Sequence, residues 1–232
     1  MPAGPFGTAL GLIASGDPQL MEIIRLSLGV TLTALAVACA IGLPLGAALA
    51  LARFPGRGAL IVVLSALMGL PPVVAGVLIY LVLSRSGPLG DLGLLFTPPA
   101  MVLAQAILIL PIVLSLTRSV IEDLWAEYAE QLRSLGSSRL RAVPTLLWDG
   151  RFSLVTCVLA GFGRAIAEVG AVLVVGGNIA GHTRTMTTAI TLETARGNLA
   201  LAVALGMILL AITLALNAGA LGLAQWARRA TG

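Results

Sequence analysis

The sequence predicts an all-α integral membrane protein with five transmembrane helices, on two observations. Only 10% of the 232 residues are charged, against roughly 25% in an ordinary soluble domain, while 58% are hydrophobic. The charged residues separate apolar stretches that are longer than the roughly 20 residues with which a helix crosses a bilayer. We therefore predict spans over residues 26–52, 58–84, 92–117, 152–175 and 197–227.

The N-terminal segment 1–19 precedes the first span. Its first 16 residues contain two prolines, four glycines and no basic residue, so the segment is too short to span and lacks the layout of a signal peptide. We expect 1–19 to be an interfacial segment on the extracytoplasmic side. Residues 20–227 would form the transmembrane domain, and 228–232 a cytoplasmic tail.

Arginine placement predicts the orientation. With the N-terminus outside, nine arginines fall in cytoplasmic segments and four in outer segments, which favours N-out and C-in because positive residues concentrate in the cytoplasm. The nine are Arg53, Arg57, Arg118, Arg133, Arg139, Arg141, Arg151, Arg228 and Arg229, and the four are Arg25, Arg85, Arg184 and Arg196.

Several spans contain residues that disrupt helices: Gly42, Pro44, Pro71, Pro72 and Pro111. In lipid, a backbone carbonyl that loses its helical partner must find another, so breaks are tolerated where helices pack together or line a cavity. Broken helices fit a transporter, and the alternative is a packing kink without a role in transport.

The composition excludes several function classes. All 14 basic residues are arginine, so the chain has no lysine for a nucleotide-binding P-loop, a Schiff base or a kinase site. Any ATP-driven process needs its ATPase on another chain. Cys39, Cys157 and the single histidine, His182, are too few and too scattered for a disulfide framework or a metal site. The arginines form no patch for nucleic acid.

The most polar stretch is residues 118–151, with five arginines and five acids. Apolar residues recur in it at helical spacing, which predicts a helix that ends at Leu135 with Gly136 as its left-handed cap. A second helix would begin at Ser137 or Ser138 as N-cap. This helix–turn–helix would be a docking surface on the cytoplasmic side; the alternative is an ordinary solvated loop.

Arg164 and Glu168 are the only charged residues inside a predicted span. Four residues apart, they would share one helix face. Ionisable residues in a membrane usually face a cavity or the interior of a helix bundle. The pair is therefore either a structural ion pair or part of a gate.

The segment before the last span is rich in glycine, hydroxyl and amide groups. Its candidate residues for the translocation path or gate are Gly176, Gly177, Asn178, Thr183 and Arg184. The segment would be a re-entrant or gating turn.

The 118–151 stretch resembles the EAA motif in the membrane subunits of ABC importers. Glu130 and Gly136 occupy the Glu and Gly positions of that motif at its spacing. Gln131 and Leu132 stand in place of the two alanines, and Asp149 in place of the closing proline.

Three further segments resemble the permeases of tungstate importers, which are relatives of molybdate and sulfate permeases. These segments are residues 67–90, 104–113 and 160–206, and the resemblance extends over roughly residues 20–226. The sequence GGNI at Gly176–Ile179 favours tungstate over its relatives.

The resemblance implies a type I ABC importer transmembrane domain in a bacterial or archaeal cell membrane, surrounded by lipid. Two copies would form a homodimer with the translocation path between them, and an extracytoplasmic protein would deliver the oxyanion. Asn178, Thr183 and Arg184 would guide this tetrahedral anion or shape the docking surface for that protein, and a gate at Arg164 would contact the anion. Two ATPase subunits, which carry ATP and Mg, would dock on the coupling loop, leaving this chain without cofactor or enzymatic activity. The implied coupling residues are Glu130, Leu135, Gly136, Ser137 and Arg139.

Other readings are less favoured. A molybdate or sulfate permease is the alternative within the same class. A secondary transporter or channel would need an intramembrane ion site, and the spans contain no acid or histidine besides Glu168. A membrane enzyme would need a metal cluster, a carboxylate pair or an activated nucleophile, and none is evident.

Overall fold

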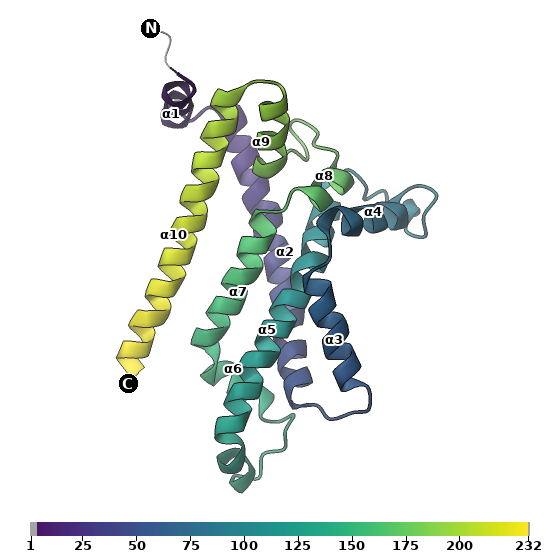
Figure 1. Ribbon diagram of the computed structural model, residues 1–232, viewed down its shortest axis with the longest axis vertical. Coiled ribbons are helices and arrows are strands. Elements are labelled where there is room, and N and C mark those ends of the chain that lie inside the picture. The colour runs from purple at the N-terminus through teal and green to yellow at the C-terminus, as the bar shows by residue number, and fades with distance from the viewer. Residues whose placement is uncertain (1–3, 232) are drawn as a thin grey trace. The chain divides into compact units, whose positions relative to one another are not determined.

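The computed structural model describes residues 4–231, with side chains up to 222 and at 225. Residues 1–3 of the predicted N-terminal segment and residue 232 of the predicted tail lie outside this range. The described residues form helices and no strand (Figure 1). The elements are α1 (Pro5–Ser15), α2 (Pro18–Leu51), α3 (Arg57–Met68), α4 (Pro72–Leu83), η1 (Gly90–Leu92), α5 (Pro98–Ser134), α6 (Val143–Asp149), α7 (Arg151–Ile166), α8 (Gly170–Gly176), α9 (Met186–Ala195) and α10 (Leu199–Thr231).

The chain forms two compact units, and α2, α5 and α10 each contribute to both. Unit 1 consists of Met1–Ala34, Pro71–Gln105 and Ala165–Leu216, and unit 2 of Leu35–Leu70, Ala106–Arg164 and Asn217–Gly232. The predicted coupling loop lies in unit 2, and the glycine-rich segment before the last span lies in unit 1.

Three described helices are long and apolar enough to cross a membrane: Pro18–Leu51, Pro98–Ser134 and Leu199–Gly222. The pairs α3–α4 and α6–α7 are each a broken span or a re-entrant loop, so the number of spans is three to five. The predicted all-α membrane class is confirmed, and five spans is the upper limit. The N-out orientation stays a prediction.

Two of the helix-disrupting prolines lie inside continuous helices. Helix α2 passes through Pro44 and α5 passes through Pro111 without a break, because each proline removes one hydrogen bond from a helix held by many others. The break between α3 and α4 does coincide with the proline pair. Pro71 is extended, with φ −62° and ψ 124°, as expected for a residue that precedes a proline.

The span predicted over 152–175 is not one helix. Helix α7 ends at Ile166 and α8 begins at Gly170, so the prediction that Arg164 and Glu168 share one helix face is wrong. At the break, the Ala171 N–H donates to Glu168 Oε1 at 2.9 Å, and the Thr187 hydroxyl donates to the Glu168 carbonyl at 2.8 Å. These bonds replace helical ones and stabilise the interruption.

The last predicted span also differs in extent. Before it lies an additional helix, α9, which Thr185 and Thr188 begin with a reciprocal capping box. Helix α10 then begins at Leu199, and its backbone continues through residues 228–231, where a tail was expected.

Within unit 1, α4 and α8 lie side by side (Figure 1). A Cβ at Gly76 would lie 2.8 Å from the Ala171 Cα, so only glycine allows this close approach. The contact positions the C-terminal end of α8, where the predicted translocation residues begin.

Candidate functional site

The coupling segment, residues 118–151, begins within α5, which runs on to Ser134. Gly136 follows with φ +73°, in the left-handed region. Its N–H donates to the Arg133 carbonyl at 2.9 Å, and the Ser137 N–H donates to the Leu132 carbonyl at 3.0 Å. This pair of bonds is the Schellman motif, and the predicted left-handed glycine cap is confirmed.

The predicted start of the second helix is wrong. Helix α6 begins at Val143 with Ala142 at the N-cap position, and the Ser137 hydroxyl donates to the Ser138 carbonyl at 3.3 Å instead of capping. Pro144 stands in the first turn of α6, where its missing N–H costs nothing and its fixed φ favours the helix.

A buried apolar cluster attaches the coupling segment to the end of α2. Ala47 and Leu51 of α2 pack with Ile121 of α5 and with Ala142 and Leu146, all five at most 1% exposed. Because residues on both sides of the turn are buried against α2, the coupling segment is a packed part of unit 2 and not a loose loop.

An arginine pair flanks Trp125 beside the turn. The guanidinium carbons of Arg133 and Arg139 lie 5.5 Å and 5.4 Å from the ring centroid, within the range of cation–π attraction. Desolvation, then the positive charges of Arg53 and Arg133, lower the pKa of the Arg139 guanidinium below its ordinary value. Arginine nevertheless stays charged at physiological pH, so the turn carries fixed positive charge.

The turn also presents an outer surface. Glu130 is exposed, and Leu135 and Leu140 are 82% and 61% exposed. Exposed apolar side chains surrounded by charges are typical of a surface that binds another protein. Ser137 and Arg139 are half-buried and support this surface.

An ionic network lies between the coupling segment and α3. Glu122 accepts hydrogen bonds from Arg57 and, at 2.5 Å, from Arg118. Arg57 also donates to the Leu49 carbonyl at 3.0 Å and to the Ala50 carbonyl at 3.3 Å, the end of α2. One carboxylate thus holds together three helices of unit 2.

We expect Glu122→Gln to destabilise the protein by about 1–2 kcal/mol, because two half-buried arginines would lose their shared counter-ion. Asp123→Asn is the matched control, since Asp123 is exposed on the same helix. Thermal unfolding of the detergent-solubilised protein measures both, and equal midpoints would contradict a stabilising network.

In unit 1, the hydroxyl of Thr183, which was predicted to guide an anion, faces inward. Thr183 is fully buried, and its hydroxyl donates to the Gly176 carbonyl at 2.5 Å and accepts from the Ile179 N–H at 2.9 Å. Gly177 adopts φ +71° at the end of α8. The Asn178 side-chain amide donates to the Thr188 carbonyl at 3.4 Å. These residues shape the turn between α8 and α9.

Thr183→Val is expected to destabilise the protein by about 2–3 kcal/mol, because it removes the partner of the buried Gly176 carbonyl and of the Ile179 N–H. Thr183→Ser retains the hydroxyl and loses only a methyl group, worth about 1 kcal/mol. Chemical unfolding in mixed micelles compares them; a Val variant as stable as the Ser variant would refute this role.

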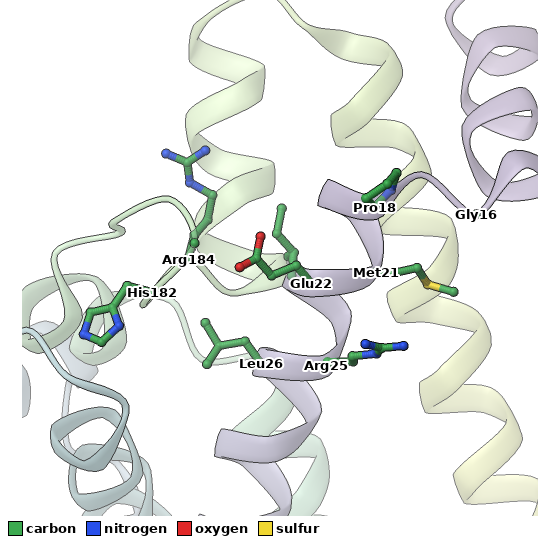
Figure 2. Close-up of a pocket in the computed structure, with 10 residues that line it drawn as sticks. Gly16, Pro18, Met21, Glu22, Arg25, Leu26, His182 and Arg184 are labelled. Atoms are coloured by element: carbon green, nitrogen blue, oxygen red, sulfur yellow. The ribbon is translucent and has the colours of Figure 1, made fainter.

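A pocket of about 700 Å³ lies in unit 1 between the start of α2 and the turn before α9. We call it the arginine pocket; its polar lining residues are Glu22, Arg25, His182 and Arg184. Figure 2 shows the Glu22 carboxylate pointing toward the turn that carries His182 and Arg184, with Arg25 and Arg184 extending on opposite sides of it. Two arginines against one glutamate make the pocket positive.

Arg184 is the predicted translocation residue that lines the arginine pocket. Its Nε atom is buried and has no hydrogen-bond partner among the described residues. A guanidinium donor that lacks a partner favours an oxyanion, which accepts charge-assisted hydrogen bonds. Sequence reasoning missed Arg25 and Glu22, because nothing in the local pattern indicates that α2 meets residues 181–184.

The comparisons with known proteins agree with this architecture. No protein-family model matches the chain. The tungstate uptake system permease protein TupB of Peptoclostridium acidaminophilum is 41% identical over 213 residues, which are 92% of this chain and 93% of that protein. The chain belongs to the family of ABC transporter permeases. A probable anion ABC transporter permease of Haloferax volcanii is 43% identical to the permease over 89% of the chain and 93% of its own length.

Sulfate permeases are more distant relatives of the permease. The sulfate transport system permease protein CysW of Synechococcus elongatus is 31% identical over 74% of the chain and 62% of its own length. Family membership and the apolar helices together make this chain a multi-pass permease of the cell membrane.

Proposed function

We propose that the permease forms the translocation path of an ATP-driven importer for a tetrahedral oxyanion, with tungstate as the substrate. The observation that carries this proposal is the 41% identity to a tungstate uptake permease over 92% of the chain. A second tungstate permease, from Campylobacter jejuni, is 43% identical over 65% of the chain. The lower identity to sulfate permeases favours tungstate over sulfate.

The proposed assembly is a homodimer with two cytoplasmic ATPase subunits and an extracytoplasmic binding protein. The ATPases dock on the coupling segment, where Leu135 and Leu140 are exposed and Glu130 supplies a charge. Arg139, stacked on Trp125, holds the turn in shape. The ATPases carry ATP and Mg, and this chain supplies the path.

Helix α5 is the proposed lever of coupling. It runs without interruption from Pro98 in unit 1 to Ser134 at the coupling turn in unit 2. When ATP binding closes the ATPases, displacement of the turn moves the whole helix, since a helix transmits motion along its axis better than a loop does. The residues at the α7–α8 break, Arg164 and Glu168, are candidates for the gate that this motion opens.

The arginine pocket is the proposed entry site of the anion. With the N-terminus outside, it lies on the extracytoplasmic side, where the binding protein releases its cargo. Arg25 and Arg184 attract a dianion, and Glu22 weakens the attraction so that the anion is passed on. Tight retention would oppose transport.

We expect Arg184→Gln to lower tungstate uptake about tenfold at limiting substrate, because it removes one charge from the entry site. Arg85→Gln is the charge-matched control at an exposed residue outside the pocket. The affinity of the binding protein for the transporter should not change. A loss of that affinity would mean that the residues form a docking surface and not an entry site.

Reconstitution tests the function. The permease is placed in liposomes with its ATPase, and the binding protein and one anion are added outside with ATP inside. ATP-dependent tungstate uptake that exceeds molybdate and sulfate uptake is expected. A preference for sulfate would refute the substrate. Uptake that is driven by an ion gradient without ATP would refute the importer and support a secondary transporter.

A further inference from the structure

One face of α7 forms the floor of an apolar groove of about 390 Å³ in unit 2. From Arg151 onward, its lining residues are spaced at i+3, i+4, i+7 and i+8, a single helix face about 12 Å long at 1.5 Å per residue. The walls come from α2, α6 and α10. The apolar lining residues are Leu154, Val155, Val158 and Leu159 on α7, Leu43 on α2, Leu147 on α6 and Ala220 on α10.

One end of the groove carries a positive charge. Arg151 is the first residue of α7 and lines the groove there. Its guanidinium carbon lies 4.7 Å from the Trp148 ring centroid and 4.5 Å from the Phe152 ring centroid, and its Nη1 donates to the Trp148 carbonyl at 2.7 Å. Two aromatic rings and a carbonyl therefore hold this guanidinium in place.

The surroundings of this end are typical of a segment at a membrane surface. Helix α6 meets α7 at 81°, and the junction carries Trp148, which is 69% exposed. Tryptophan concentrates at the boundary between lipid tails and water. With Trp148 at that boundary, the groove would start at headgroup level and continue along α7 toward the hydrocarbon.

We propose that this groove is a binding site for an anionic phospholipid. One acyl chain lies on the Leu154–Leu159 face of α7, and the phosphate binds to Arg151. The chemistry is complementary along the whole groove: an arginine fork matches a phosphate, and the apolar lining matches a chain. Among the described residues no carboxylate forms an ion pair with Arg151, so its charge is available to a headgroup.

The ligand is a lipid and not a soluble anion, because nearly all of the groove is apolar and would leave a hydrated oxyanion unsolvated. The site is separate from the arginine pocket, since its residues belong to unit 2 and those of the pocket to unit 1.

Native mass spectrometry of the full-length permease, purified in detergent, tests the proposal. Phosphatidylglycerol and phosphatidylcholine with identical chains are added in parallel. We expect the wild-type permease to retain phosphatidylglycerol and the Arg151→Gln variant to bind about fivefold less of it. This factor corresponds to the attraction of one positive charge to an anionic membrane surface. Arg141→Gln, which removes the same charge from an exposed residue, should bind as the wild type does.

Two further variants separate headgroup and chain. Arg151→Lys keeps the charge and is expected to retain most of the binding, which guards against a misfolded Gln variant. Val155→Phe narrows the groove and is expected to lower retention with Arg151 intact. Glycerol phosphate, which has the headgroup but no chain, should not compete.

Each contrary result overturns the proposal. Equal retention of both lipids, or no difference between Arg151→Gln and Arg141→Gln, would exclude a specific headgroup site. Competition by glycerol phosphate would mean that the site binds a soluble phosphate. If Val155→Phe dissociates a dimer without changing lipid retention, the groove packs against a second copy of the chain.

Discussion

Gly136→Val is expected to abolish uptake while leaving membrane insertion intact. Gly136 has φ +73°, a conformation that costs an ordinary L-residue about 1–2 kcal/mol and a β-branched one more. No heavy atom lies within 4 Å of a Cβ built at this position, so the effect comes from the backbone and not from a clash. The turn would open, and Leu135 and Arg139 would lose their places on the docking surface.

Gly136→Asn is the control, because asparagine tolerates the left-handed conformation. We expect it to retain most of the uptake. Uptake of the cognate anion into cells, with membrane content of the permease measured by immunoblot, compares the two variants. Normal uptake by the Val variant would refute the role of the turn in coupling.

Gly46→Ala is expected to lower the stability of unit 2 by about 3 kcal/mol. The added Cβ would lie 2.6 Å from the Leu114 carbonyl oxygen and 2.9 Å from the Thr117 Cβ, and a backbone oxygen cannot turn aside. Helices α2 and α5 would have to separate next to Ala47, which belongs to the cluster beneath the coupling segment.

The same substitution elsewhere on α2 has the opposite expected sign. A Cβ at Gly29 meets nothing within 4 Å, so Gly29→Ala gains about 1 kcal/mol of helix propensity at no cost in packing. Thermal unfolding monitored by size-exclusion chromatography measures both variants. Equal midpoints would mean that α2 and α5 do not pack as closely at Gly46 as described.

The sequence predicted the end of the first helix at the coupling turn but not the start of the second. Gly136 was predicted as a left-handed cap, because a glycine after an amphipathic helix has few other reasons to be there. The serines after it were predicted to cap the next helix, and the cap position is instead Ala142. The packing of Ala142 and Leu146 in the apolar cluster outweighs the preference of serine for the N-cap position, so it decides where the second helix begins.

The candidate site was also predicted only in part. Arg184 was predicted from its polar surroundings and does line a pocket. Arg25 and Glu22, more than 150 residues earlier in the chain, were not predicted to join it. Thr183 was predicted to guide an anion, but its hydroxyl is bound to two backbone groups.

The sequence by itself determined the all-helical membrane class, the long apolar spans and the Gly136 turn. Hydropathy and the conformational preference of glycine are local properties, so they can be predicted from residues that are neighbours in the sequence. The tertiary structure alone decided where α7 stops and which side chains meet. At the break after Ile166, the Thr187 hydroxyl donates to the Glu168 carbonyl, and the first N–H of α9, at Met186, donates to the Ser27 hydroxyl on α2. A buried polar group needs a partner wherever in the chain that partner occurs, and no local pattern contains that information.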